Sequence, residues 1–492
     1  MRKLKANWFE RVLMEVAPGM ARRRVEEKLL CRAYYSAAET GRRKDGWTTT
    51  NGTAEQLNRG DRDRIRARAR DLERNDDLYK GIIKDLERNV VSRGIILQAN
   101  VSGQDGEEDD AINNAIEKAW KIWSRPENCT VNGMLSLCEV QRMAVRRRFV
   151  DGGLLILKVV RDGRLRLQLL EVDDLDTTIT GYQGRRVVGG VEIDGYAGPV
   201  AYHIRKLDVM GYYSGEAIRV PADRVIYLSC QDRVSQVREV SPSASSLARV
   251  DDIEQLMEAA IKKEQVQACF AVAITSETPS GVGLGRSLSS ATGSSGGARN
   301  EAAYPEEVIY PGMIKHLQPG ESITSINPAG QSTTADGLIR SIQRQAGAGA
   351  GLSYEAVSRD LSQTNYSSGR MGQLQDRRTY GEWQQYLIDH FLQPIFCEWL
   401  QLEVLGGRLI LPDYWTEPDR YESVRWVPPG WDWIDPLKEA NANKIALETA
   451  QTTLQKICAS RGEDYRDVLA QWQREKKQLA EFAAENTPKE EI

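Results

Sequence analysis

Residues 247–275 read LARVDDIEQLMEAAIKKEQVQACFAVAIT, and this stretch decides how the chain is organised. Apolar side chains recur in it at spacings of three and four, which places them on one face of a helix. They are Leu247, Val250, Ile253, Met257 and Ile261. Charged side chains cover much of the remaining surface, so we expect one long amphipathic helix over this stretch.

A second helical pattern begins at Thr334, after an insert that is rich in glycine and serine between residues 281 and 299. Its apolar face uses Leu338, Ile339 and Ile342. The two helices form either an ordinary hairpin of a monomer or the shaft of a subunit that works in a ring. Helical periodicity is the same in both cases, so both interpretations stay open.

The composition is that of an ordinary soluble chain with room for about three domains. Of 492 residues, 41% are hydrophobic and 28% are charged, with a formal net charge of -4, and this balance does not require a nucleic-acid partner. Seven cysteines form no C-x-x-C pair and three histidines stand alone, which predicts reduced thiols and no metal site. No signal peptide or membrane-spanning run is found, so no membrane partner is expected.

The first half of the chain combines helices with a small sheet. Helices are expected at 62–93, with a break at Asn75-Asp76, and at 111–123 and 133–149. Arginines at 62, 64, 66, 68 and 70 step by two, so they are expected to point all round their helix. Short β segments between Asp151 and Ser229 predict a mainly antiparallel sheet, with a hairpin at Asp162-Gly163.

The second half is expected to be mostly helical. One long helix covers 371–402, and Pro394 should disturb it. A final helical block starts at Asp435-Pro436 and is interrupted at Glu463-Asp464.

Three carboxylates, Asp173, Asp174 and Asp176, permit a metal-dependent nuclease site. No histidine or second acidic cluster supports them at helical spacing, and an aspartate-rich turn accounts for them without chemistry. The glycine-rich GVGLG at 281–285 lacks the Lys-Ser/Thr of a Walker phosphate loop. The sequence therefore predicts no cofactor, no metal and no enzymatic activity.

Several stretches together resemble the lambda-type portal proteins of tailed bacteriophages. The resemblance covers nearly the whole chain and follows the order of that family. The stretches are RARDLERNDDLYKGIIKDLERNVVSRG (68–94), GGVEIDGYAGPVAYHI (189–204), VPADRVIYLSCQDRVSQVREVSP (220–242), YPGMIKHLQPGESI (310–323), TNYSSGR (364–370) and WIDPLKEANA (433–442).

The resemblance implies an α+β, mostly helical subunit that assembles into a ring of about twelve copies. Its expected parts are an N-terminal arm (1–60), a mixed α/β wing (61–246), a first stem helix (247–275), a small α/β clip (276–333), a second stem helix (334–350), a channel loop (351–370), a long helix with the wing return (371–435) and a C-terminal helical crown (436–492).

The resemblance also implies the function and the partners. Such a ring occupies one vertex of the capsid in the virion, and its subunits assemble in the host cytoplasm. Double-stranded DNA is packaged and ejected through the ring without sequence recognition. The expected partners are further copies of the chain, the large terminase subunit, the head–tail connector protein and the major capsid protein.

Two groups of residues are assigned on this basis. Leu247, Val250, Ile253, Met257 and Ile261 are expected to pack stem helices between subunits. The loop residues expected to face DNA are Arg359, Ser362, Gln363, Thr364 and Asn365. A monomeric capsid scaffold or adaptor protein is the alternative function, and the nuclease is a second alternative.

Overall fold

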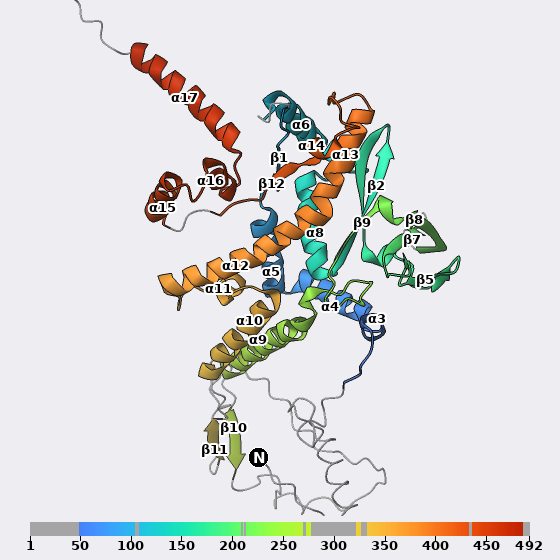
Figure 1. Ribbon diagram of the computed structural model, residues 1–492. Coiled ribbons are helices and arrows are strands. Elements are labelled where there is room, and N and C mark those ends of the chain that lie inside the picture. Colours follow the sequence, from blue (N-terminus) through green and yellow to red (C-terminus); the bar gives the residue numbers. More distant parts are fainter. Residues whose placement is uncertain are drawn as a thin grey trace, which may run out of the picture. The chain divides into compact units, whose positions relative to one another are not determined.

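The computed structural model of the chain describes residues 49–103, 108–207, 210, 213–268, 272–276, 321–325, 332–431 and 435–485 (Figure 1). It divides into two units, Met1–Leu57 and Asn58–Ile492. The first unit is described only from residue 49 onward. The short helix α3 (Ala54–Asn58) lies at the end of this unit. Most of the expected N-terminal arm therefore lies outside the described residues. The second unit holds the other described helices and strands.

The core of the second unit lies among helices from both halves of the sequence. They are α4 (Arg62–Asn75), α5 (Asp77–Leu86) with the π-helical turn η3 (Glu87–Val91), α6 (Asp110–Trp123), α7 (Pro126–Cys129), α8 (Leu137–Val150), α12 (Tyr366–Leu387) and α13 (Gln393–Leu405). Trp120 and Trp123 of α6 stack with their ring centroids 4.7 Å apart. Trp120 also meets the edges of Phe396 and Trp399 of α13. Aromatic contacts thus join segments that are far apart in sequence.

The expected break between α4 and α5 is confirmed. Asp76 is the N-cap of α5, and its side chain accepts a hydrogen bond from the backbone N–H of Tyr79. The helix expected from Gly133 begins later, at Leu137, because Ser136 and Glu139 form a capping box there.

Two antiparallel sheets follow α8. The first has the order β3-β2-β9, with β2 (Gly153–Arg161), β3 (Arg164–Leu170) and β9 (Val225–Ser229). The second has the order β4 (Gly181–Tyr182), β5 (Arg185–Val188), β6 (Val191–Ile193), β7 (Pro199–Leu207) and β8 (Tyr213–Pro221). Short 3-10 turns at Val172–Asp174, Ala222–Arg224 and Pro242–Ser245 connect these parts.

The predicted hairpin at Asp162-Gly163 is confirmed. Both residues have positive φ, 54° and 70°, and Arg161 pairs with Arg164 across the turn. Two positive φ angles in succession are the geometry that Asp-Gly turns favour between antiparallel strands.

The long helix is interrupted where the sequence predicted a disturbance, but it starts earlier than predicted. Five residues of π-helix, η7 (Ile388–Leu392), separate α12 from α13, and Pro394 follows directly. Proline cannot donate the backbone hydrogen bond that a regular helix needs at that position. The helix begins at Tyr366 and not at Met371, because Asn365 caps it.

The remaining elements lie in the C-terminal part. The strand β12 (Val424–Val427) follows α14 (Pro418–Glu422) and pairs antiparallel with β1 (Ile96–Ala99). The last helices are α15 (Pro436–Glu448), α16 (Leu454–Ser460) and α17 (Tyr465–Glu485). The expected helix start at Asp435-Pro436 and the expected break near Glu463 are both confirmed. Among the described helices, none is both long and apolar enough to cross a bilayer.

Candidate channel loop and stem helices

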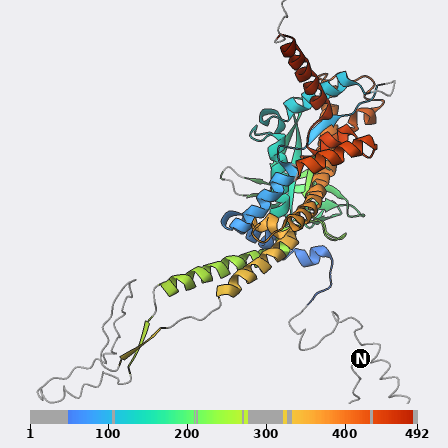
Figure 2. The ribbon, with the colours of Figure 1, turned by 90° about the vertical axis from the view of Figure 1, so that its left-hand side faces the viewer.

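Two helices lie side by side and lead to and from a small hairpin (Figure 2). They are α9 (Leu247–Ala268) and α10 (Ser332–Ala350), and the hairpin pairs β10 (Val272–Ser276) with β11 (Glu321–Ser325). The helix expected to reach Thr275 therefore ends at Ala268. Residues 272–276 read VAITS, and β-branched residues favour a strand over a helix. The glycine-rich insert at 281–299 lies outside the described residues.

The structure separates the five predicted stem-packing residues into two groups. Leu247, Val250 and Ile253 are 5%, 0% and 3% exposed, so they pack inside their own chain, and their expected contacts between subunits stay a prediction. Met257 and Ile261 are 49% and 55% exposed. The difference arises because the first turns of α9 lie against α4 and α10, whereas its later turns extend beyond the core.

Gly349 of α10 lies close to the residue that precedes α9. A Cβ atom on Gly349 of α10 would lie 2.1 Å from Oγ of Ser246, directly before α9. The next atoms, Ser245 Oγ and Ser246 Cβ, lie at 3.5 Å, so a side chain at this position would require the Ser246 hydroxyl to turn away.

The candidate channel loop runs from Arg359 to Asn365, between the short helix α11 (Tyr354–Ser358) and α12. Arg359 ends α11 in the left-handed conformation, with φ of 56°. Asp360 then accepts hydrogen bonds from the Tyr354 hydroxyl and the Ser362 backbone N–H, both at 3.0 Å. The bonds from Ser362 lower the pKa of Asp360 to about 2. The start of the loop is thus tied to α11.

The end of the loop is tied as well. Thr364 Oγ1 donates to Glu355 Oε1 at 3.1 Å, and Asn365 Oδ1 accepts from the Ser368 backbone N–H at 2.8 Å. Of the five predicted loop residues, Thr364 and Asn365 therefore hold the fold. The side chains of Arg359, Ser362 and Gln363 are exposed.

Acidic side chains lie beneath the loop. A hollow of about 580 Å³ is lined by Asp85, Glu355 and Asp376 together with Tyr380 and Trp431. Burial raises the pKa of Asp85 and of Asp376, although Asp85 accepts a hydrogen bond from the Tyr380 hydroxyl and Asp376 accepts two from Ser353. Arg370 and Arg377 line the same hollow, so cations stand beside these carboxylates.

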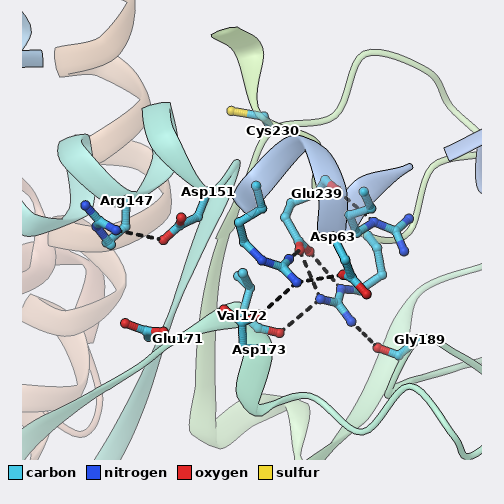
Figure 3. Close-up of polar contacts among 12 residues, drawn as sticks. Asp63, Arg147, Asp151, Glu171, Val172, Asp173, Gly189, Cys230 and Glu239 are labelled. Carbon is cyan, nitrogen blue, oxygen red and sulfur yellow. Dashed lines mark hydrogen bonds and ion pairs between the residues drawn. The ribbon is translucent and has the colours of Figure 1, made fainter. Parts of the chain in front are cut away.

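A buried ionic network connects α4 and the two antiparallel sheets to the segment that leads into α9, and sequence reasoning missed it. Glu239 is fully buried and accepts bonds from Arg238 at 2.7 Å and from Arg66 at 3.1 Å (Figure 3). Burial alone would raise the pKa of Glu239, but Arg238 holds it below its usual value. The Arg238 side chain also bonds the backbone oxygens of Val172 and Gly189.

The arginines of α4 lie on two sides of the helix, since Arg64 and Arg68 are exposed whereas the other three face the protein. Arg62 and Arg66 are 6% and 5% exposed, and Arg70 lies one turn further on the same side. Positions four apart share a helix face, so residues 62, 66 and 70 form one inward stripe. Because arginine occupies every second position from 62 to 70, the sequence alone did not single out this stripe.

The three candidate nuclease carboxylates serve separate structural contacts. Asp173 pairs with Arg66 at 2.8 Å and with Arg70 at 2.7 Å. Asp174 accepts from the Tyr213 hydroxyl, and Asp176 accepts from Thr178. Within the part of the chain that the structure describes, no group of three or more His, Cys, Asp or Glu side chains could hold a metal ion.

The family model and the curated relatives give the same family. The family described as phage portal protein, lambda family, matches residues 40–384. A probable portal protein of Halomonas phage phiHAP-1 is 27% identical over 460 residues, covering 91% of this chain and 86% of that protein. Portal protein B of Escherichia phage lambda is 22% identical over 439 residues, covering 83% and 82%. A solved chain from the neck of an empty GTA particle is 13% identical with a TM-score of 0.43, covering 80% of this chain and 93% of that one. Since the family match spans well over half of its length, the chain belongs to the lambda family of phage portal proteins.

Proposed function

We propose that this chain closes into a ring of about twelve identical copies and that double-stranded DNA passes through the ring when the phage head is filled and emptied. Family membership supports the portal role at the capsid vertex. In this proposal α9 and α10 are the stem, the β10–β11 hairpin belongs to the clip at 276–333, and α15, α16 and α17 belong to the crown at 436–492.

The observation that carries the DNA-conduit proposal is the chemistry of the loop from Arg359 to Asn365. A conduit has to border the DNA without gripping it, because every phosphate contact adds sequence-independent attraction that movement must break. Among the exposed loop side chains, Arg359 is the one cation, Ser362, Gln363 and Asn365 are neutral polar groups, and Leu361 is apolar. Contacts from neutral groups to the phosphate backbone are weak, and backbone contacts carry no sequence information.

The nearby carboxylates limit the attraction further. Asp360 stays ionised because its pKa lies at about 2, and it is 3.9 Å from Arg340 of α10. Glu355 is engaged by Thr364. The loop therefore presents a surface close to electrical neutrality, which suits a sliding contact.

The partners follow from the position in the particle. The clip end would face the large terminase subunit during packaging and the head–tail connector protein afterwards, while the wing and crown would meet the major capsid protein and the capsid interior. The energy for DNA movement would come from the terminase, and the portal chain itself would act as a structural protein without enzymatic activity. Assembly would take place in the host cytoplasm.

The first experiment is negative-stain electron microscopy of the purified chain together with mass measurement in solution. Rings with a central hole are expected. Particles that remain at the monomer mass of 55.2 kDa, even with procapsid components present, would overturn the ring and favour an adaptor.

The second experiment tests the loop. We expect the triple variant Arg359→Ala, Ser362→Ala, Gln363→Ala to form rings at the wild-type yield but to package or retain DNA less well. These side chains are chosen because they are exposed and do not hold the loop, whereas Thr364 and Asn365 make the hydrogen bonds that fix its end. Unchanged packaging would remove the loop from the channel.

A further inference from the structure

Three consecutive residues at the start of α11 connect the candidate channel loop to the helix that follows it. Tyr354 and Glu355 form the hydrogen bonds to the start and to the end of the loop that are described above. Ser353, the N-cap of α11, donates two hydrogen bonds to Asp376 of α12. The loop is therefore held by the first turn of α11, and that turn is held by one carboxylate of α12.

The contact between Ser353 and Asp376 uses both carboxylate oxygens. The backbone N–H of Ser353 donates to Oδ1 of Asp376 at 2.7 Å, and Ser353 Oγ donates to Oδ2 at 2.6 Å. Two hydrogen bonds between the same pair of residues add geometric specificity to the attraction. The pair thus fixes the orientation of the Ser353 backbone as well as its distance from α12.

Asp376 is a costly residue for its surroundings. It is 4% exposed, and burying a carboxylate costs free energy that its hydrogen bonds have to offset. An apolar side chain would avoid this cost, so the stability of α12 alone does not explain a carboxylate here. What the carboxylate supplies is two acceptors at one position, and both receive Ser353.

Two further residues of α12 contact the same joint, which comprises residues 351–353 between α10 and α11. Thr379 Oγ1 donates to the backbone oxygen of Gly351 at 2.7 Å, and a Cβ on Gly372 would lie 3.4 Å from Cβ of Ser353. Residues 372, 376 and 379 are four and three apart, so they share one face of α12. Gly351 has a φ of 72°, which favours glycine, and it makes the turn after α10. One face of α12 therefore binds the joint.

Apolar packing does not fix the orientation of α11. Leu352 and Val357 are each 5% exposed and anchor the segment in the core, but apolar burial is non-directional. The hollow of about 580 Å³ described above is lined by Ala356 of α11 and by Gln373 of α12. Open space thus lies between parts of the two helices, and the hydrogen bonds from Ser353 to α12 are what sets the rotation of α11 about its two anchors.

We propose that Asp376 is the positioning residue of the candidate channel loop. By holding Ser353 it fixes the start of α11, and through Tyr354 and Glu355 it fixes the loop that α11 carries. The position of the loop is then set by α12. The inference rests on the proposed function only in that this loop borders DNA.

The mobility of the loop in the full-length protein tests this role. A spin label is attached to p-acetylphenylalanine in place of the exposed Gln363, so that the native cysteines stay unlabelled. We expect the rotational correlation time of the label to fall by about twofold or more in Asp376→Ala. The same label in place of the exposed Gln451, which lies outside the loop, should keep its wild-type motion.

Three further variants separate the possible causes. Asp376→Asn keeps an acceptor for the Ser353 N–H and gains an NH2 group that can donate to Ser353 Oγ, so it should restore the wild-type motion. Thr379→Val removes the hydroxyl donor, keeps the shape of the side chain and should release the loop less than Asp376→Ala. Glu382→Ala removes an exposed carboxylate of the same helix, and as the matched control it should change nothing.

The outcomes decide the proposal and separate it from the proposed function. Unchanged motion at position 363 in both Asp376→Ala and Thr379→Val would overturn the positioning role. Increased motion at 363 and 451 together would overturn it too, because a general loss of structure would then explain the result. Asp376→Asn as mobile as Asp376→Ala would contradict the two-bond geometry. Increased motion at 363 alone, with unchanged DNA packaging by unlabelled Asp376→Ala rings, would support the positioning role and remove the loop from the channel.

Discussion

The carboxylate of Glu239 forms ion pairs with two buried arginines, Arg238 and Arg66. Its side chain is fully buried, and the side chains of Arg238 and Arg66 beside it are 1% and 6% exposed. Substitution Glu239→Gln removes the charge that faces Arg238 in the interior, while Arg66 keeps Asp173 at 2.8 Å. Breaking one partner of a buried ion pair costs about 3–5 kcal/mol, so we expect a loss of that order in the free energy of unfolding. Urea denaturation of the chain measures it.

The matched control is Glu216→Gln. Glu216 is exposed and faces Lys206 at 3.4 Å, and such surface pairs contribute about 0–1 kcal/mol. If both variants lost equal stability, the network around Glu239 would not be what holds the segment before α9.

The contribution of Glu192 to the stability of the five-stranded sheet depends on pH. Its carboxylate is bonded by Arg219 at 2.7 Å and by Arg185 at 3.1 Å, and these bonds lower the pKa of Glu192 to about 2. A carboxylate whose pKa is lowered on folding stabilises the fold above the pKa of the unfolded chain, about 4.3. That stabilisation is lost as the pH falls from about 4.3 through about 2.

The variant Glu192→Gln checks this window. Above pH 5 it should be less stable than the wild type, and the difference in thermal midpoint should shrink as the pH is lowered toward 2. A difference that stays constant over that range would show that Glu192 does not titrate with folding.

The N-cap residue Asn365 marks the boundary between the candidate channel loop and α12. Asn365 bonds the backbone N–H of Ser368, and this bond starts α12 directly after the loop. Loss of an N-cap side chain costs about 1 kcal/mol, so Asn365→Ala should lower the stability by that amount. Ser367→Ala, at the second position of the same helix and exposed, should be neutral within about 0.5 kcal/mol. Equal effects in thermal denaturation would contradict the assignment of the cap.

Elements with a regular pattern and a local signal could be predicted from the sequence. The Asp162-Gly163 hairpin, the cap at Asp76 and the disturbance at Pro394 each follow from the chemistry of one or two residues. The start of α12 was missed because the capping residue Asn365 was interpreted only as a neutral donor for DNA.

Properties that depend on what covers a surface could not be predicted. The five apolar residues of α9 form one continuous pattern, yet Val250 is covered by its own chain and Met257 is not. Periodicity shows that a face is apolar but does not show which neighbour buries it. Likewise, Arg66 is charged in sequence whether it faces water or Glu239.

For the whole molecule, symmetry multiplies the effect of any loop substitution. As a member of the portal family the chain works at the capsid vertex, and in the proposed ring each loop residue occurs about twelve times around the DNA. Gln363→Lys would therefore add up to about twelve cations at one level of the channel. Each cation that meets a phosphate strengthens binding and steepens its salt dependence.

We therefore expect Gln363→Lys particles to package DNA about tenfold more slowly at low salt, with the rate recovering as salt screens the added charge. The measurement is an in vitro packaging assay at several salt concentrations. The control is Gln451→Lys, which adds the same charge at an exposed position between α15 and α16, outside the loop. A Gln363→Lys rate equal to the wild type at every salt concentration would mean that the loop does not reach the DNA. A fall in rate for both variants would instead indicate that the total charge of the ring slows packaging. The two variants add the same charge, so a contact between the loop and DNA should slow only Gln363→Lys.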